Sequence, residues 1–413
     1  MRVLRTGLVL SVKRKSDGSI DKYKARCIAK GYQQRWGVDY DETFSLVLRY
    51  DSAKLIISLA AARDARLYHL DFKTAYLNAP LEEAIYIDVP FAYKVKTKGD
   101  IVLKLRKSLY GLKQSGRNWR ELIHNWLTDY GFTQSRQHPC VYSMHHDDDH
   151  LSLGIYVDNL LIADFSGNPK ICDAFLLAIT STFKTTLSDD IDSFLSMKLT
   201  RSAAGIKVTI SRAILELLER TGLLNARPVD TPMAENLHLV ASADAELLDA
   251  DDATEYRLIA GALIHISHFR PDIMFAMGTL THFMSRPGEP HLGAAKRVLR
   301  YLAGTIDLGL MFKANVDLDF TAFVDADYAN CTDTRKSISG FVTQVGGSTV
   351  SAWREKQSVV TLSSTEAEYV AVTSVAKEVI ALRQLLADIG FPQSSATPVG
   401  EDNVSCIALS KND

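Results

Sequence analysis

Residues 151–163 read LSLGIYVDNLLIA, a stretch that decides the first unit of the fold. The apolar residues predict two buried strands, Leu151–Ile155 and Leu160–Ala163, joined by a tight hairpin whose tip carries Asp158. A carboxylate at such a tip is buried or nearly so, and burying an unpaired charge is costly. Asp158 is therefore a candidate functional residue, with an ordinary turn aspartate as the alternative.

A second carboxylate, Asp71, lies in the short strand predicted at Tyr68–Phe72 (YHLDF). If the two strand ends converge, Asp71 and Asp158 could hold a pair of Mg²⁺ (or Mn²⁺) ions about 3.5–4 Å apart. Such a pair would activate a 3′-hydroxyl group and stabilise a leaving pyrophosphate. Two unrelated turn aspartates are the alternative on position alone, and His69 is predicted to be a packed histidine.

Basic and aromatic residues surround these acids in the sequence. Alternation along the strand predicted at Tyr23–Lys30 puts Lys24, Arg26 and Lys30 on one face, where they suit triphosphate oxygens. Tyr76 could pack beneath a sugar ring. The stretch KSLYGLKQSGRNW (residues 107–119) joins a glycine turn to polar side chains that suit a base pair and its backbone: Gly111, Lys113, Gln114 and Arg117. Solvated basic surfaces are the alternative.

The composition indicates a globular chain with a basic first third. Of 413 residues, 46% are hydrophobic and 23% are charged, which is typical of about two to four folded domains. The first 120 residues hold 24 Lys and Arg against 12 Asp and Glu, so this part carries +12 and the rest −14. This excess indicates a polyanionic partner, unless it is only a solvated face.

Five scattered cysteines, the lack of a membrane-length apolar run and the lack of a signal peptide predict an intracellular protein, in the cytoplasm or the nucleus.

The periodicity predicts an α+β protein. Helices are expected at Asp51–Ala65, Arg117–Tyr130, Pro169–Phe183, Arg212–Gly222, Tyr256–Met284 with a break at Arg270-Pro271, His291–Leu302 and Ser363–Ile389. The segment 225–251 is rich in Pro, Ala, Asp and Asn, which predicts a domain boundary there. Past Leu318 four strands are expected: LDFTAFV, SISGFVTQV, TVSAW and SVVTL. The run HHDDDH (145–150) is predicted to be a solvated hairpin tip, and residues 16–19 a turn.

Three further acids lie in the C-terminal part. Asp325 ends the strand FTAFVD, and Asp402 follows the strand predicted at Thr397–Gly400. Glu368 lies on the long helix in line with an apolar stripe made of Val372, Val375, Val379 and Leu382. Its carboxylate is therefore aimed inwards and needs a partner. Together the acids could hold a second pair of divalent metal ions, which would activate water. For Asp402, a helix N-cap is the alternative. Glu366 is predicted to be a capping-box residue.

The motifs YKARCIAKGYQQ, DYDETFSLVLR, LDFKTAYLN, KSLYGLKQSGRNW and YVDN resemble, in this order, the reverse transcriptase of copia-type LTR retrotransposons. Further on, FRPDIMFA, HLGAAKRVLRYLAGT, DADYANCTDTRKSISGF and LSSTEAEYVA resemble the connection and RNase H region of the same Pol polyprotein. The resemblance implies a right-hand polymerase of fingers, palm and thumb, followed by a connection and an RNase H-like α/β domain. The implied divisions are 1–165 (fingers and palm), 166–230 (thumb), 231–312 (connection) and 313–413 (RNase H-like).

The resemblance also implies the catalytic acids. Asp71 and Asp158 would bind metal in the polymerase, with Asn159 beside them as a further metal ligand. Asp325, Glu368 and Asp402 would be the catalytic, metal-binding acids of the RNase H domain, with Mg²⁺ or Mn²⁺ as cofactor.

Roles in nucleotide and template binding follow from the same motifs. Tyr76 would exclude ribonucleotides, and Lys24 and Arg26 would contact the phosphates of the incoming nucleotide. Gly111 and Gln114 would position template and nucleotide. The implied function is RNA-directed DNA polymerase with ribonuclease H, and the implied partners are RNA template, DNA primer, RNA–DNA hybrid and dNTPs, without a membrane.

The chain departs from the family pattern at several positions. The family reads YVDD where this chain reads YVDN, so Asn159 supplies an uncharged amide. Leu46 and Gly116 replace prolines, and Ser196 replaces a glycine. Both the fingers and the RNase H-like domain are expected to be truncated. The alternative hypothesis is therefore a catalytically inactive retroelement relic that retains only a nucleic-acid-binding fold.

Overall fold

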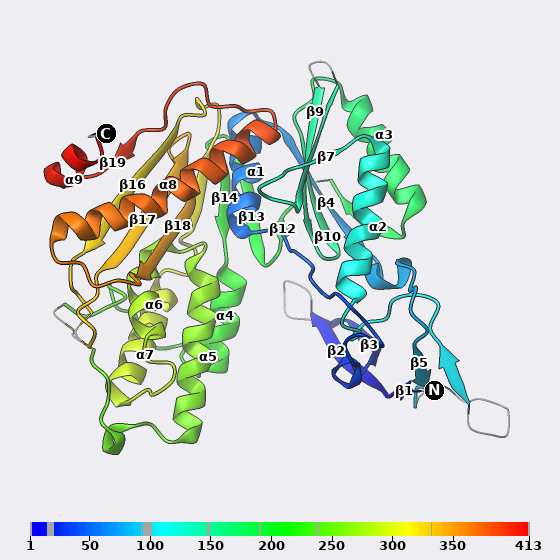
Figure 1. Ribbon diagram of the computed structural model, residues 1–413, viewed down its shortest axis with the longest axis horizontal. Coiled ribbons are helices and arrows are strands. Elements are labelled where there is room, and N and C mark those ends of the chain that lie inside the picture. Colours follow the sequence, from blue (N-terminus) through cyan, green and yellow to red (C-terminus); the bar gives the residue numbers. More distant parts are fainter. Residues whose placement is uncertain are drawn as a thin grey trace.

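The computed structural model describes residues 2–14, 20–91, 93, 101–146, 149–189, 191–235, 237, 239–331 and 333–411. Over these residues the chain is a mixed α/β structure, in agreement with the α+β class expected from the sequence. In Figure 1, the sheet that carries the first candidate site lies at the upper right with helices beside it and N-terminal strands below it, and a C-terminal sheet lies at the upper left above a group of helices. The turn expected at 16–19 lies outside the described residues.

The first candidate site is built on a six-stranded antiparallel sheet with the order β11-β4-β10-β9-β8-β7. We call it the central sheet. Its strands are β4 (Arg66–Phe72), β7 (Thr133–Gln134), β8 (Val141–His146), β9 (Asp149–Tyr156), β10 (Asn159–Asp164) and β11 (Thr185–Ser188).

The two faces of this sheet belong to different cores, which explains its unbroken apolar strands. Along β10, Leu160 and Ile162 join the core under helices α2 (Ser115–Tyr130) and α3 (Pro169–Thr182). Leu161 and Ala163 join the core that contains helix α1 (Tyr50–Ala62). Because side chains alternate along a strand, both sets of residues are buried.

The N-terminal part consists of two small sheets. Strands β2 (Thr6–Arg14) and β3 (Ile20–Ala29) pair antiparallel, and β1 (Val3–Leu4), β5 (Tyr86–Asp88) and β6 (Val102–Lys104) form a three-stranded sheet. The 3-10 helices η1 (Gly31–Gln33) and η2 (Ala75–Asn78) follow β3 and β4.

The middle of the chain combines a sheet with a helical layer. The antiparallel sheet contains β12 (Ser193–Phe194), β13 (Met197–Ser202), β14 (Gly205–Thr209) and β15 (Leu310–Lys313). Between β14 and β15 come α4 (Ser211–Arg220), η3 (Asp244–Glu246), α5 (Ala250–Ser267), η4 (Pro271–Ile273), α6 (Met274–Thr281) and α7 (Glu289–Gly304). The gap between α5 and α6 confirms the break predicted at Arg270-Pro271.

The C-terminal sheet has the order β18-β17-β16-β19 and carries the second candidate site. Strands β16 (Phe320–Asp327), β17 (Ile338–Val345) and β18 (Ser348–Lys356) are antiparallel, and β19 (Val399–Gly400) runs parallel to β16. Helix α8 (Ser364–Asp388) crosses this sheet, and α9 (Val404–Leu409) follows β19 (Figure 1).

Helix α1 joins these parts. Every residue from Ser52 to Ala62 is buried, because α1 packs against β4, β9 and β10 as well as β14, β15 and β18. Even Lys54 is buried; its ammonium group pairs with Asp51 Oδ1 (3.0 Å) and donates to His268 O (3.0 Å). One continuous core therefore runs from the central sheet to α8.

One expectation about a chain segment is wrong. Residues 358–362 (SVVTL) form no strand, because they lead into the start of α8 and pair with no strand among the described residues. In the first unit, the packing continues past residue 165. Helix α3 covers the central sheet and β11 pairs with β4, so the first unit extends to Ser188.

The hairpin between β8 and β9 is also more than a solvated tip, although residues 147–148 lie outside the described part. The His150 ring stacks on Phe165 (centroids 4.5 Å apart) and on His145 (4.9 Å), and it meets Phe391 edge-on (5.2 Å). These contacts bring the C-terminal part against the central sheet.

Candidate active sites

The β9–β10 hairpin holds Asp158 at a fixed tip. Val157 has a left-handed backbone (φ +54°), and its carbonyl oxygen accepts a hydrogen bond from the Trp119 indole N–H (2.6 Å). The carbonyl oxygen of Asp158 accepts from the backbone N–H of Phe72 (2.7 Å). The tip is therefore tied to both α2 and β4.

The two predicted carboxylates belong to neighbouring strand ends at this tip. In the register of β10 and β4, Asn159 lies directly opposite Asp71, so Asp158 is one residue away. Burial raises the pKa of Asp158, and the charge of Asp71 raises it further, whereas Lys24 and Arg26 act in the opposite direction. Two converging carboxylates form an oxygen-rich set of the kind that Mg²⁺ and Mn²⁺ prefer.

The amide of Asn159 is already engaged by its neighbours. Its Nδ2 donates to Asp158 Oδ1 (3.0 Å), and its Oδ1 lies 2.8 Å from His69 Nε2. The sequence did not predict the contact with His69. The signal for it was present, since His69 lies two residues before Asp71 and alternation puts both on one face of β4.

An aromatic pair lies beside the acids. The Tyr76 and Tyr110 ring centroids are 4.7 Å apart, and the Arg26 guanidinium lies 5.5 Å from the Tyr110 centroid. Burial and then the charge of Asp158 raise the pKa of both tyrosines. Tyr110 was not predicted as a site residue, although it directly precedes the predicted Gly111.

Gly111 fixes the loop of residues 107–114 against the end of β3. Its φ is +94°, and a Cβ atom there would lie 2.1 Å from Ala29 O, so only glycine fits. The backbone N–H of Ala29 donates to Tyr110 O (2.8 Å). Tyr110 is thereby held beside Arg26, which lies on β3.

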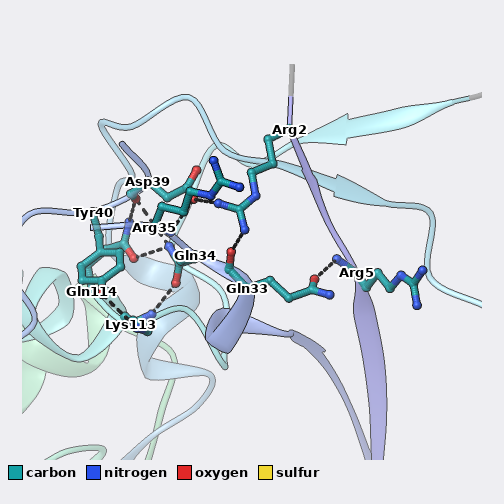
Figure 2. A network of polar contacts seen from close by, with 9 residues as sticks. All are labelled: Arg2, Arg5, Gln33, Gln34, Arg35, Asp39, Tyr40, Lys113 and Gln114. Atoms are coloured by element: carbon teal, nitrogen blue, oxygen red, sulfur yellow. Dashed lines mark hydrogen bonds and ion pairs between the residues drawn. The ribbon is translucent and has the colours of Figure 1, made fainter. Parts of the chain in front are cut away.

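Figure 2 shows the polar network that continues from this loop into the N-terminal part. The side chain of Gln34 accepts from the Lys113 backbone N–H (2.8 Å) and donates to Gln114 Oε1 (2.9 Å). Gln114 Nε2 donates to Asp39 O (2.9 Å), and the residue is only 2% exposed. Gln114 therefore supports the loop and does not present its amide to solvent.

The other predicted basic residues contact groups other than Asp71 and Asp158. Lys113 Nζ donates to Tyr40 OH (2.8 Å), and Arg117 pairs with Glu42 (2.6 Å) and with Glu121 (3.3 Å). Lys30 follows the end of β3, where its backbone N–H donates to Arg5 O (2.8 Å). Of the predicted nucleotide-binding set, Lys24, Arg26 and Tyr76 act electrostatically on Asp158 or are affected by it.

The second acidic centre contains Asp325, Glu368 and Asp402. One carboxylate oxygen from each lies within 4.8 Å of the others. Asp325 comes from β16, Glu368 from the first turns of α8, and Asp402 from the loop after β19. At the start of α8, Ser363 Oγ accepts from the Glu366 N–H (3.1 Å), which is one half of the predicted capping box. The other half differs, because Glu366 Oε2 accepts from the N–H of Leu362 (2.6 Å), one residue before the N-cap.

The N-cap alternative for Asp402 is wrong. Asn403 begins α9, and its Oδ1 accepts from the Cys406 N–H (2.9 Å). The Asp402 carboxylate is therefore available to the cluster.

Glu368 shows that the cluster suits a cation. It is 6% exposed, and its Oε2 is buried without a hydrogen-bond partner among the described residues. Burial raises its pKa to about 7, and the negative charges of Glu401, Asp325 and Asp402 contribute to the rise. An oxygen in this state is better satisfied by a hard divalent ion than by further carboxylates.

Residues 4–235 match the family described as "Reverse transcriptase (RNA-dependent DNA polymerase)". The chain belongs to the copia-type reverse transcriptase family. This confirms the resemblance found in the sequence.

Relatives of this reverse transcriptase family member occur in plants and in yeast. It is 36% identical over 405 residues to the "Retrovirus-related Pol polyprotein from transposon RE2" of Arabidopsis thaliana, covering 98% of this chain and 27% of that polyprotein. It is 36% identical over 420 residues to the corresponding polyprotein from transposon TNT 1-94 of Nicotiana tabacum, covering 100% and 31%. The "Putative transposon Ty5-1 protein YCL074W" of Saccharomyces cerevisiae is 30% identical over 314 residues, covering 75% of this chain and 100% of the yeast protein.

The chain spans between about a quarter and a third of the two plant polyproteins. Within the described part of the chain, no helix is long and apolar enough to cross a membrane.

Proposed function

We propose that the protein is a retrotransposon RNA-directed DNA polymerase, which extends a DNA primer on an RNA template. The observation that carries this proposal is the approach of Asp71 and Asp158, with Lys24 and Arg26 acting on the same carboxylate. These acids would hold a pair of Mg²⁺ (or Mn²⁺) ions, which would supply activation of the primer hydroxyl and charge stabilisation at the leaving pyrophosphate.

The surrounding side chains would hold the nucleotide. Lys24 and Arg26 would bind the triphosphate oxygens of the dNTP. Tyr76, supported by Tyr110, would lie beneath the sugar and exclude ribonucleotides. Gly111, Lys113, Gln114 and Arg117 would act on the template through the position of their loop, with Asn159 as an uncharged neighbour of the metal site.

The proposed architecture is a right hand followed by two further parts. The strands up to β3, with β5 and β6, would be the fingers, and the central sheet with α2, α3 and β11 would be the palm. We assign the thumb to residues 189–230, the connection to 231–312 and an RNase H-like domain to 313–413. The implied setting is intracellular, where RNA template, primer, RNA–DNA hybrid and dNTPs are present.

A second activity is proposed from the second acidic centre. Asp325, Glu368 and Asp402 would hold divalent ions that activate water against the RNA strand of a hybrid. Cleavage of an RNA–DNA hybrid by the full chain tests this. Glu368→Gln should abolish cleavage, whereas Glu366→Gln, the same change two residues away on α8, should leave it intact. Cleavage that survives Glu368→Gln would refute the proposal.

Primer extension by the purified chain tests the polymerase proposal. We expect Asp71→Asn and Asp158→Asn each to lower extension with Mg²⁺ by on the order of 10²-fold or more, because charge stabilisation in the transition state is lost. The matched control is Asp64→Asn, since Asp64 is an exposed turn residue before β4 that pairs with Arg201 (3.0 Å). Equal rates for all three variants would refute the assignment. No extension by the unaltered chain, with primer–template binding retained, would favour the inactive-relic alternative.

A further inference from the structure

Arg354 carries a positive charge at the junction of β18 and α6. Its guanidinium carbon lies 4.6 Å from the centroid of the Phe275 ring on α6. A Cβ atom at Gly278, one turn further along α6, would lie 2.5 Å from Arg354 Nη1, so the guanidinium lies directly against the helix backbone. Within the described part of the chain, the Arg354 side chain forms no hydrogen bond and no ion pair.

The surroundings of Arg354 disfavour an unpaired charge. Burial lowers the pKa of its guanidinium group, and the charge of Asp327 acts in the opposite direction. Asp333 and Glu355 border the cavities beside Arg354, but neither they nor Asp327 form an ion pair with it among the described residues. A buried charge is stable only when opposite charges or hydrogen-bond acceptors meet it. The guanidinium group therefore lacks acceptors for its N–H groups.

Two further basic side chains border the same cavities. Lys356 lies two residues along β18 and His282 directly follows α6, and both line the two cavities that Arg354 lines. Lys356 Nζ donates to the sulfur of Cys331 (3.9 Å), which is a weak acceptor. Burial, and then the charges of Lys356 and Arg354, lower the pKa of His282, so the three groups act on one another. Such a group of basic side chains suits an anion with several oxygens.

The strand register relates this basic group to the second acidic centre. Asp325 on β16 pairs with Gly340 on β17, and Gly340 pairs with Arg354 on β18. Paired residues share one face of a sheet and neighbouring strands lie about 4.8 Å apart, so the Cα atoms of Asp325 and Arg354 are about 10 Å apart. Among the described residues, the Cβ position of Gly340 meets only Trp353 O within 4 Å (3.6 Å). Phe323, on the same face as Asp325, is 53% exposed. This face is therefore accessible between the two groups.

We propose that Arg354, Lys356 and His282 form a phosphate-binding site, which takes a backbone phosphate of an RNA–DNA hybrid beside the second acidic centre. The Arg354 guanidinium would donate two parallel N–H groups to one phosphate, and Lys356 would add a second positive charge. A nucleic acid suits this arrangement better than a free anion, because one strand offers phosphates both to the acidic centre and to the basic site. This inference rests on the proposed cleavage of a hybrid and adds a site that fixes the position of the strand.

Binding of a fluorescently labelled RNA–DNA hybrid to the full chain tests the site, measured by anisotropy at several salt concentrations and without metal, so that the hybrid is not cut. We expect Arg354→Met to weaken binding by about tenfold and to reduce the slope of log affinity against log salt by about one, because one phosphate contact is lost. Arg354→Lys keeps the charge and should restore the slope but not the full affinity.

Three measurements separate binding from folding. Lys377→Met removes one positive charge from an exposed position on α8 and should change neither affinity nor slope. Lys356→Met should reduce the slope in the same way as Arg354→Met, so the result does not depend on the folding of one variant. Without ligand, Arg354→Met should not lower the thermal unfolding midpoint, because the charge it removes has no partner.

The outcomes also separate this inference from the proposed function. Unchanged affinity and slope in Arg354→Met would overturn the site, and hybrid cleavage by the unaltered chain would then leave the proposed function standing. A reduced slope in Arg354→Met, with no cleavage by the unaltered chain, would support the site and refute the cleavage. Inorganic phosphate distinguishes the two sources of the anion. If it raises the unfolding midpoint of the unaltered chain but not of Arg354→Met, while both bind the hybrid equally, the site takes a free anion and the inference is wrong.

Discussion

At the first acidic centre, Asn159 supplies an uncharged amide where the family pattern has a second carboxylate. Its Nδ2 donates to Asp158 Oδ1 (3.0 Å), so Asn159→Asp would replace a donor by a second carboxylate. One unit charge about 4 Å away is worth about 4 kcal/mol at an effective dielectric constant of about 20. We expect primer extension with Mg²⁺ to rise about tenfold or more, because metal binding is strengthened. Without metal, the unfolding midpoint should fall.

Asn125→Asp, on the exposed face of α2, is the matched control and should change neither quantity. If Asn159→Asp and the unaltered chain extend primers at equal rates, the missing charge does not limit the polymerase.

Among the elements, the loop of residues 107–114 depends on one glycine. Gly111→Ala would place a Cβ 2.1 Å from Ala29 O at a φ of +94°. We expect it to destabilise the protein by about 2 kcal/mol or more in urea unfolding, since backbone strain and a backbone clash add. Primer–template affinity should fall as well, because Tyr110 loses its place beside Arg26.

Gly37→Ala separates the two causes. Gly37 also has a positive φ (+75°), but nothing lies within 4 Å of its Cβ position. It should therefore cost only about 1 kcal/mol. Equal losses for the two variants would show that the clash with Ala29 is relieved by movement of the loop.

The sequence predicted those features that local periodicity determines. The two apolar runs around Asp158 and the inward stripe through Glu368 follow from side-chain spacing along one strand or one helix. Burial of Gln114 and the contact between Asn159 and His69 depend on segments far apart in the chain. SVVTL (358–362) has β-branched residues, but it pairs with no strand in the part of the chain that the structure describes, and propensity alone does not supply one.

At the scale of the whole molecule, the end of α8 docks on the edge of the central sheet. Ser135 Oγ donates to Asp388 Oδ2 (2.6 Å), and Ser143 Oγ donates to Asp388 O (2.6 Å). Beside them, His150 packs between aromatic rings of both parts. Burial, and then the charge of His145, lower the pKa of His150 to about 4. The docked state therefore favours neutral His150.

Acid should weaken this docking. Because the folded-state pKa of His150 lies below the value of about 6.5 expected in the unfolded chain, stability is intact above about pH 6.5 and falls as the pH drops towards 4. We expect the unaltered chain to lose on the order of 1 kcal/mol more than His150→Asn between pH 7 and pH 5. Thermal unfolding at both pH values measures this. At pH 7, the difference in stability between the unaltered chain and His150→Asn reports only the packing that the substitution removes. If the stabilities of the two proteins fall by the same amount between pH 7 and pH 5, the prediction is wrong.

The length of α8 has a consequence for the order of events on a nucleic acid. About 20 residues separate Glu368 from Asp388, so the helix holds the second acidic centre about 30 Å from its dock on the central sheet. That length equals about nine base-pair steps. With both proposed activities present, a rigid α8 would keep the second centre at a constant distance from the sheet that carries the first. Each cut in the RNA would then fall at a constant spacing from the point of synthesis.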